Sequence, residues 1–352
     1  MLNFNPGPSI LPAEALEEIR RNFMNFGGMS ILEISHRSKE FENILEDAKA
    51  LFAELMAIPK NYHILFLQGG ASLQFAMVPM NLMEKCADYS LTGYWSKKAL
   101  KEAKLFGEAN IPFSSENSAF SRTPKPAEIS LSQKSSYLHI TSNNTIYGTQ
   151  YHEFPETGDI PLVADMSSDI LSRKIDVSKF GLIYAGAQKN LGPAGTTVVI
   201  IRDDLLKREY RKLPTMLKYS IHAESNSLYN TPPVFAVYAM SYVLKWIKKS
   251  GGIDAIEKIN REKADTLYKT IDSSNLYCGT AEKSSRSSMN VTFRLKNTAL
   301  ENRFLDEAKK AEMAGLKGHR EIGGIRASIY NAFPLDGVKK LAEFMKEFER
   351  KI

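Results

Sequence analysis

Cysteine is scarce in this chain of 352 residues, and its scarcity excludes two classes of protein. The two cysteines, Cys86 and Cys278, stand far apart and form no CxxC pair. A disulfide-stabilised secreted scaffold and a cysteine-rich zinc site both need more thiols at closer spacing. We therefore expect no metal site of this kind and a location in the reducing cytoplasm.

Targeting and membrane-spanning segments are also missing. The N-terminal residues MLNFNPGPSILP lack the basic stretch and apolar run of a signal peptide. The most apolar helical candidate, residues 232–247, is shorter than the roughly 20 residues that cross a bilayer, and it leads into Lys248 and Lys249. We interpret this segment as a core helix and expect no membrane partner.

The chain has no long basic block, although its net charge is +6. Basic residues are interspersed with acidic ones, as in REKADTLYK, and no five- or six-residue basic run contains aromatic residues. A nucleic-acid-binding protein usually shows such clustering. A solvated surface with a slight basic bias is therefore favoured, although a positive site for an anionic small substrate also fits.

Short apolar runs alternate with amphipathic stretches through the first two thirds of the chain. Runs rich in β-branched and aromatic residues predict strands near residues 62–68, 136–142, 161–167, 181–187 and 196–202. This alternation predicts an α/β fold, with a mostly parallel central sheet covered by helices. After Gly251 and Gly252 the pattern becomes α+β. We expect an arm at residues 1–14, a large domain at 15–250 and a smaller C-terminal domain at 251–352.

Several chemically distinctive residues follow predicted strands, where ligands bind in open α/β sheets. The turn Gly69-Gly70-Ala71-Ser72 is either a tight connection or a phosphate site at a helix N-terminus. Trp95 is either a core indole or a plate on which an aromatic ligand stacks. Asp165 is either a helix cap or the partner of a buried cation.

Lys189 lies in the segment IYAGAQKNLGPAG, directly after an apolar strand and among small residues. Most lysines only improve solubility, but an amine against apolar walls can have its pKa lowered enough to act as a nucleophile. A phosphate-type turn, a Trp, an acid and a lysine at one sheet edge match the needs of pyridoxal 5′-phosphate (PLP). We predict that Lys189 binds this cofactor covalently and that Asp165 keeps its ring nitrogen protonated.

Arginine and histidine pairs predict a site for substrate anions. SHRS supplies His36 and Arg37, and GHREIGGIRAS supplies His319, Arg320 and Arg326. The guanidinium group matches carboxylate and phosphate with two parallel hydrogen bonds, although each arginine taken alone is more often a surface ion-pair former. In YNTPP, Asn230 and Thr231 form either a capping turn or another phosphate contact.

Taken together, these pieces resemble the phosphoserine aminotransferases, a group of class V aminotransferases with PLP fold type I. The resemblance spans nearly the whole chain, from NFNPGPSILP through QGGASLQFAMVPMNL, TGYWSKKA, NNTIYGTQ and ADMSSDILSR to AGAQKNLGPAG and GHREIGGIRASIYNA. The order and spacing of these segments are specific to the family. One departure affects a contact: Ser72 stands where some relatives carry a substrate-binding arginine.

The resemblance implies a role for each site residue. Lys189 is the Schiff-base lysine and Asp165 the partner of the ring nitrogen. The cofactor is also contacted by a set of residues near these two: Ala71, Ser72, Trp95, Thr145 and Gln188. The family further implies a homodimer in which Asn230 and Thr231 reach the phosphate from the other subunit. Substrate anions are bound by His36, Arg37, His319, Arg320 and Arg326, with Arg326 on the α-carboxylate.

The implied reaction is reversible amino transfer from L-glutamate to 3-phosphohydroxypyruvate, a step of serine biosynthesis. Some relatives also aminate a phosphorylated four-carbon analogue in pyridoxine biosynthesis, and the sequence does not decide whether this chain does so. The alternative is another class V activity, such as an alanine–glyoxylate or serine–pyruvate aminotransferase. A cysteine desulfurase would need a mobile nucleophile, for which only Cys278 is available. A basic binding module would leave Lys189, Asp165 and Trp95 unexplained.

Overall fold

A seven-stranded sheet forms the centre of the computed structural model, which describes residues 1–352. The strand order is β2-β10-β9-β8-β5-β3-β4. β10 runs antiparallel to both of its neighbours, and all other adjacent pairs are parallel, so the predicted mostly parallel sheet is confirmed. The strands are β2 (Tyr62–Leu67), β3 (Cys86–Leu91), β4 (Glu108–Ser114), β5 (Leu138–Thr141), β8 (Leu162–Asp165), β9 (Leu182–Gly186) and β10 (Thr197–Arg202).

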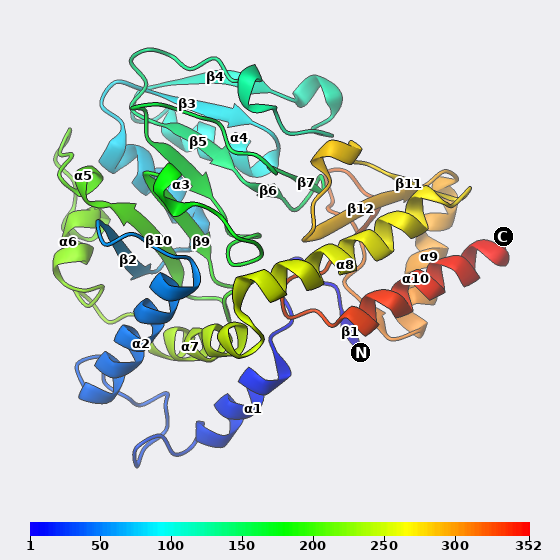
Figure 1. Ribbon diagram of the computed structural model, residues 1–352, viewed down its shortest axis with the longest axis horizontal. Helices are drawn as coiled ribbons and strands as arrows, with labels where there is room; N and C mark the ends of the chain where they lie inside the picture. Colours follow the sequence, from blue (N-terminus) through cyan, green and yellow to red (C-terminus); the bar gives the residue numbers. More distant parts are fainter.

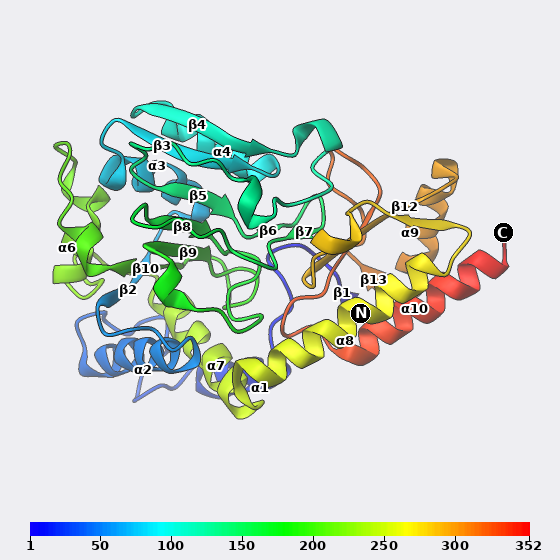
Figure 2. The same ribbon diagram turned by 45° about the horizontal axis from the view of Figure 1, so that its top comes forward.

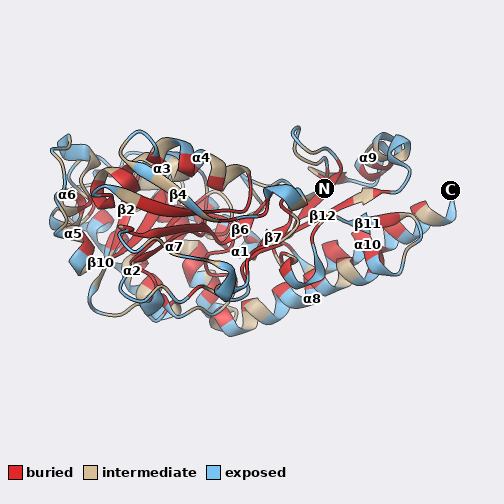
Figure 3. Cartoon of the chain, turned by 90° about the horizontal axis from the view of Figure 1, so that it is seen from above, coloured by how far each residue is buried: buried red, intermediate tan, exposed pale blue.

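Helices cover both faces of this sheet. Successive side chains of a strand point to opposite faces, and in these strands the side chains on both faces are mostly apolar and need to be covered. In β9, Ile183 and Ala185 pack in the core beside α2 and α7, while Leu182 and Tyr184 pack in the core beside α3 and α4. Figure 1 shows this arrangement, and Figure 3 shows the strands as the most buried layer. The helices are α1 (Ala13–Asn22), α2 (Lys39–Leu55), α3 (Gly70–Leu82), α4 (Tyr94–Ala103), α5 (Asp203–Leu206), α6 (Tyr219–Glu224) and α7 (Val234–Lys249).

The C-terminal third builds a separate three-stranded antiparallel sheet in the order β11-β12-β14. Phe293 of β12 and Phe304 of α9 belong to a hydrophobic core of its own. Figure 2 shows α8 running from the large sheet toward this core, with α10 alongside its C-terminal half. The elements are α8 (Gly252–Asp272), β11 (Tyr277–Gly279), β12 (Asn290–Leu295), α9 (Glu301–Lys310), β14 (Ile325–Ser328) and α10 (Leu335–Arg350).

Two small strand pairs complete the fold, and one of them joins segments that are far apart in the sequence. β1 (Leu2–Asn3) pairs in parallel with β13 (Met313–Ala314), which attaches the N-terminus to the C-terminal third. β6 (Asn143–Asn144) pairs with β7 (Thr149–Gln150) just beyond the end of β5. Neither pair was predicted from the sequence, and neither were α2 and β4. In residues 1–352, no helix combines the length and the apolar character needed to cross a membrane.

Candidate active site

A cavity of about 260 Å³ opens at the carboxyl ends of β5, β8 and β9. This is the edge of a parallel sheet at which ligands bind, and the volume is near the lower end of ligand pockets, roughly 300–1,000 Å³. Nine of the residues singled out in the sequence line it: Ala71, Ser72, Trp95, Thr145, Asp165, Gln188, Lys189, His319 and Arg326.

Lys189 enters this cavity from the turn after β9. Its Nζ lies 6.0 Å from the centre of the Trp95 ring. Burial lowers the pKa of the Lys189 amine to about 8; the negative charge of Asp165 acts in the opposite direction, and the positive charge of Arg326 lowers the pKa further. More free amine therefore exists near neutral pH than for an ordinary lysine, which favours a role as nucleophile or general base.

Asp165 ends β8 and is 6% exposed. Its Oδ1 accepts hydrogen bonds from the Ser167 amide at 2.9 Å and the Ser167 hydroxyl at 2.6 Å, while Oδ2 accepts none. Burial raises the pKa of Asp165, whereas the Ser167 bonds and the Lys189 charge lower it. One oxygen is thus fixed by its own turn, and the other is available to a cationic ligand group.

Two helix N-termini border the cavity. Gly69 and Gly70 have φ values of 87° and 65°, a left-handed conformation that lets the chain turn sharply from β2 into α3. Ala71 and Ser72 consequently lie in the first turn of α3, where unpaired amides favour an anion. Trp95 begins α4, and its indole Nε1 donates to Thr145 Oγ1 at 3.2 Å.

Arg326 brings a buried positive charge from β14 of the second sheet. The side chain is 6% exposed, its Nη1 donates to the Thr145 carbonyl at 3.3 Å, and its Nε has no partner. Burial lowers the pKa of this guanidinium. His319 lies beside Tyr94, with ring centres 5.5 Å apart, and burial lowers its pKa as well. The cavity therefore offers cationic and donor groups for substrate anions opposite Lys189.

The N-terminal arm closes one side of the cavity. Pro6 and Gly7 line it, and the Ser9 amide and hydroxyl donate to the carbonyls of Gln188 and Lys189, respectively. A side chain at Gly7 would approach Lys189 Cγ within 3.3 Å. These contacts were not predicted from the sequence, and neither were three small or polar wall residues of the cavity: Thr141, Ser167 and Ser168.

Five sequence-predicted residues lie outside this cavity. Asn230 borders a different, small cavity, and the Thr231 carbonyl accepts from Gln68 Nε2 at 2.7 Å. The Arg320 side chain is 84% exposed. The other two are His36, whose Nε2 is buried without a partner, and Arg37, which is exposed.

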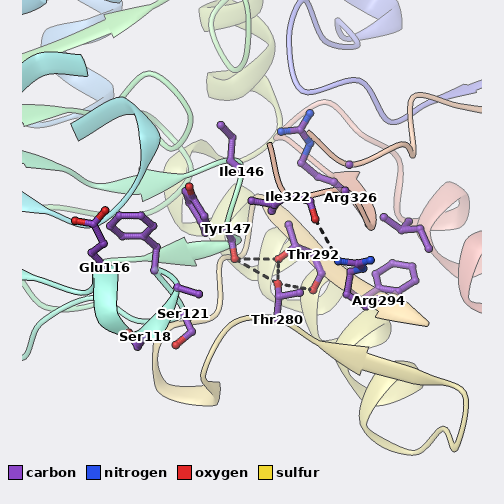
Figure 4. Close-up of a pocket in the computed structure, with 16 residues that line it drawn as sticks. Glu116, Ser118, Ser121, Ile146, Tyr147, Thr280, Thr292, Arg294, Ile322 and Arg326 are labelled. Atoms are coloured by element: carbon purple, nitrogen blue, oxygen red, sulfur yellow. Dashed lines mark hydrogen bonds between the residues drawn. The ribbon is translucent and has the colours of Figure 1, made fainter. Parts of the chain in front are cut away.

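A second cavity, of about 460 Å³, adjoins the first between the two sheets (Figure 4). Ile146 and Arg326 line both. Arg294 of β12 forms an ion pair with Glu301, and its Nη1 donates to the Ile322 carbonyl at 3.2 Å. These contacts hold the loop that carries His319 against the second sheet.

The chain matches the family model described as "Aminotransferase class-V" over residues 1–341. The chain belongs to the class V aminotransferases. This aminotransferase is 56% identical over 354 aligned positions to a phosphoserine aminotransferase of Desulfosudis oleivorans, covering 99% of this chain and 98% of the relative. A solved phosphoserine aminotransferase, studied for radiation damage of its Schiff base, is 55% identical with a TM-score of 0.98 and covers 100% and 99% of the two chains. A PLP-bound phosphoserine aminotransferase from Trichomonas vaginalis is 37% identical with a TM-score of 0.93, covering 97% and 99%.

Pyridoxal phosphate is the cofactor of this aminotransferase, and the residues present suit it. The buried Thr141 Oγ1 on the cavity wall has no hydrogen-bond partner, and Asp165 Oδ2 accepts no donor. Buried polar atoms are normally paired, so the unpaired Thr141 hydroxyl fits a polar ligand in this cavity, and Asp165 Oδ2 is free to accept from one. The cavity also offers an amine, a carboxylate, an indole and a helix N-terminus, which are groups that would suit the aldehyde, ring nitrogen, ring face and phosphate of the cofactor.

Proposed function

We propose that this aminotransferase catalyses reversible transfer of an amino group from L-glutamate to 3-phosphohydroxypyruvate, which yields O-phospho-L-serine and 2-oxoglutarate. The observation that carries the proposal is the convergence of Lys189, Asp165 and Arg326 on one cavity, in a chain 56% identical over its length to a named phosphoserine aminotransferase. The product is an intermediate of L-serine biosynthesis. Use of the phosphorylated four-carbon substrate of pyridoxine biosynthesis is a second reaction that the same pocket would permit.

Lys189 and Asp165 perform the central chemistry in this proposal. When bound, pyridoxal phosphate supplies an electron-accepting ring that stabilises negative charge at the substrate Cα. The Lys189 amine would remove the proton from the substrate Cα as a general base. The Asp165 carboxylate would keep the ring nitrogen protonated. Both substrates use one site in turn, so ping-pong kinetics are expected.

The remaining cofactor contacts fix the position of the ring. Trp95 would stack on one face of the ring, and Thr145, which accepts from the Trp95 indole, would orient that indole. The amides of Ala71 and Ser72 would bind the phosphate at the start of α3. Gln188 borders the same cavity, and its carbonyl anchors the Ser9 amide of the arm. These contacts confine the ring so that Lys189 reaches the substrate Cα.

Arg326 is proposed to bind the α-carboxylate that all four substrates share. Its planar group offers a forked pair of donors, and its unpaired buried Nε is available for such a bond. The γ-carboxylate of glutamate and the phosphate of the keto acid occupy one further anion site. That site is formed by four residues: His36, Arg37, His319 and Arg320.

Replacement of Arg326 by alanine is expected to lower kcat/KM roughly 10²–10³-fold for glutamate and for the phosphorylated keto acid alike, since both lose a buried charge-assisted contact. Arg326→Lys should recover only part of the loss because it lacks the fork. Half-reactions followed by cofactor absorbance measure each substrate separately. Arg303→Ala, on the exposed face of α9, is the matched control. A loss of kcat/KM confined to one substrate would contradict the proposal that Arg326 binds the α-carboxylate that the substrates share.

The protein is further proposed to be a homodimer whose active sites lie at the subunit interface. Asn230 and Thr231 lie away from the cavity of their own chain, and large apolar side chains are exposed near them and in the N-terminal third, including Tyr229, Met24 and Leu32. We expect Asn230 and Thr231 to contact the cofactor phosphate of the partner. Sedimentation equilibrium should give twice the 39.5 kDa chain mass; a monomer with full activity would overturn this arrangement.

The proposed division of the chain is an arm at 1–14, a large domain at 15–250 and a small domain at 251–352. The separate cores of the two sheets support it. Two unpaired cysteines also support a cytoplasmic location.

A coupled assay tests the proposed substrate. Glutamate with 3-phosphohydroxypyruvate should give a kcat/KM far above that with pyruvate or glyoxylate, because only the first keto acid fills the second anion site. Equal or higher activity with the unphosphorylated acids would instead favour an alanine–glyoxylate or serine–pyruvate aminotransferase.

A further inference from the structure

Lys263 is a lysine that the chemistry above does not use, and it is fully buried. It lies on α8, and its side chain is 0% exposed. Its Nζ donates to the main-chain carbonyls of Tyr330 at 2.6 Å, Ile329 at 2.9 Å and Phe333 at 3.2 Å. An ammonium group has three N–H donors, and these three carbonyls use all of them. A fourth carbonyl, that of Asn331, lies at 3.5 Å.

Lys263 lies at the part of α8 where the helix passes from one hydrophobic core to the other. Ile253 and Ile256 pack in the core beneath the large sheet, whereas Ala264 and Leu267 pack in the core of the second sheet. Between these apolar turns, α8 buries two polar side chains, Asn260 and Lys263. Polar groups are placed in such a position only when specific partners satisfy them.

The partners of Lys263 continue into the active site from two directions. Ile329 directly follows β14, the strand that carries Arg326. Asn331 donates through its amide to Asn190 Oδ1 at 3.0 Å, and Asn190 is the residue after Lys189. Asn260 Nδ2 also contacts Asn331 Oδ1 at 2.9 Å and the Ser172 carbonyl at 3.0 Å. One buried network thus joins α8, the end of β14 and the turn that projects Lys189.

We propose that Lys263 is a positioning residue: by gathering the carbonyls of Ile329, Tyr330 and Phe333, it fixes Arg326 and, through Asn331 and Asn190, Lys189 relative to each other. This role rests on the proposed aminotransferase function. A displacement of about 1 Å at reacting groups can lower a rate about 10²-fold, so a residue that touches neither substrate nor cofactor can still control catalysis. Burial lowers the pKa of Lys263 to about 7, while its three carbonyl acceptors favour the charged form.

The test compares Lys263→Met, which keeps the length of the side chain and removes the donors, with Lys258→Met on the exposed face of the same helix. Lys263→Met should lower kcat about 10- to 100-fold and raise KM for both substrates, because Arg326 and Lys189 lose their fixed separation. It should also move the pH midpoint of the visible band of the bound cofactor by about half a unit or more. Lys258→Met should change none of these quantities.

A structural readout that needs neither cofactor nor turnover completes the test. In cofactor-free protein, amide hydrogen exchange at residues 186–191 and 325–333 should be faster in Lys263→Met than in wild type, and unchanged in Lys258→Met. If the wild type does not use the phosphorylated keto acid, the proposed function fails. The exchange comparison would still show whether Lys263 orders these two segments.

Asn190→Ala keeps the test decisive if Lys263→Met does not fold. This change leaves Lys263 and its carbonyls in place and removes the acceptor of the Asn331 amide, together with two longer contacts that Asn190 Nδ2 donates, to the Ser168 carbonyl at 3.3 Å and to Met289 Sδ at 3.8 Å. It should lower kcat about tenfold and shift the pH midpoint in the same direction as Lys263→Met. The proposal is overturned if Lys263→Met only lowers the melting temperature while kcat, KM and the pH midpoint stay at wild-type values, or if Asn190→Ala leaves all three unchanged.

Discussion

Replacement of Lys189 by alanine is expected to lower kcat by on the order of 10⁴-fold or more while pyridoxal phosphate remains bound. The expected loss is large because the proposal gives one amine both the covalent link to the cofactor and the transfer of the substrate proton. No other lysine lines the cavity. Binding should survive because the proposed contacts of Asp165, Trp95 and the start of α3 with the ring nitrogen, the ring face and the phosphate are unchanged.

Three measurements separate these two effects. Dialysed Lys189→Ala protein should retain a stoichiometric amount of cofactor by absorbance after denaturation. Borohydride treatment should add the mass of the reduced cofactor to the Lys189 peptide of the wild type and to no peptide of the variant. A single-turnover mixture with glutamate should show proton loss from Cα slowed by the same factor as kcat.

The matched control is Lys60→Ala, an exposed lysine in the loop before β2. It should keep wild-type activity and borohydride labelling. Turnover by Lys189→Ala within tenfold of wild type would mean that another base removes the proton, and the role proposed for Lys189 would be wrong.

The sequence was sufficient to place the candidate site because of a geometric rule. Parallel strands end at one edge, so residues that follow β5, β8 and β9 must lie near one another. Thr145, Asp165 and Lys189 are such residues, and all three line the same cavity. Trp95 and Ser72 lie in the first turns of the helices that follow β3 and β2, and they obey the same rule. The positions of strand ends in the sequence therefore place these five residues at one edge of the sheet, and the strand order of the structure brings them together.

Contacts made by main-chain atoms could not be read from the sequence. The Ser9 hydroxyl donates to the Lys189 carbonyl across 180 positions, and Lys263 donates to carbonyls 66 to 70 positions away. Every residue carries a carbonyl, so neither contact leaves a compositional signal. A buried lysine within a charged helix looks like its exposed neighbours until the packing of α8 against both cores is known.

Some residues with predicted roles lie away from the cavity of their own chain, and they form another class. Arg37 is exposed on one chain, and Asn230 borders a cavity other than the one that holds Lys189. The family resemblance predicted roles for both, but the geometry of a single chain cannot bring them to a shared site. Their roles therefore stay predictions, which the mass measurement and the substrate comparison address.

The second large effect is expected from Asp165→Asn, which should lower kcat about 10²–10³-fold with little change in cofactor content. The substitution keeps the size of the side chain but replaces a negative charge with a neutral amide beside the ring nitrogen. The proton on that nitrogen then loses the charge that stabilises it, and the ring accepts electrons from the substrate Cα less well. The bonds from Ser167 to Oδ1 survive, so the fold of the β8 turn should persist.

Asp169→Asn is the matched control for this change because it removes a buried carboxylate four residues further along the same segment. Asp169 is 5% exposed, its oxygens accept from Ser142 and Gln150, and it does not line the cavity. We expect it to lower the melting temperature, since Ser142 and Gln150 lose a charged acceptor, while kcat falls less than tenfold. Cofactor absorbance spectra across pH should show loss of the protonated-ring form in Asp165→Asn only. Of the two carboxylates, only Asp165 lines the cavity. Equal losses of kcat in the two variants would therefore mean that the loss comes from removing any buried negative charge in this region, and the specific role proposed for Asp165 would be wrong.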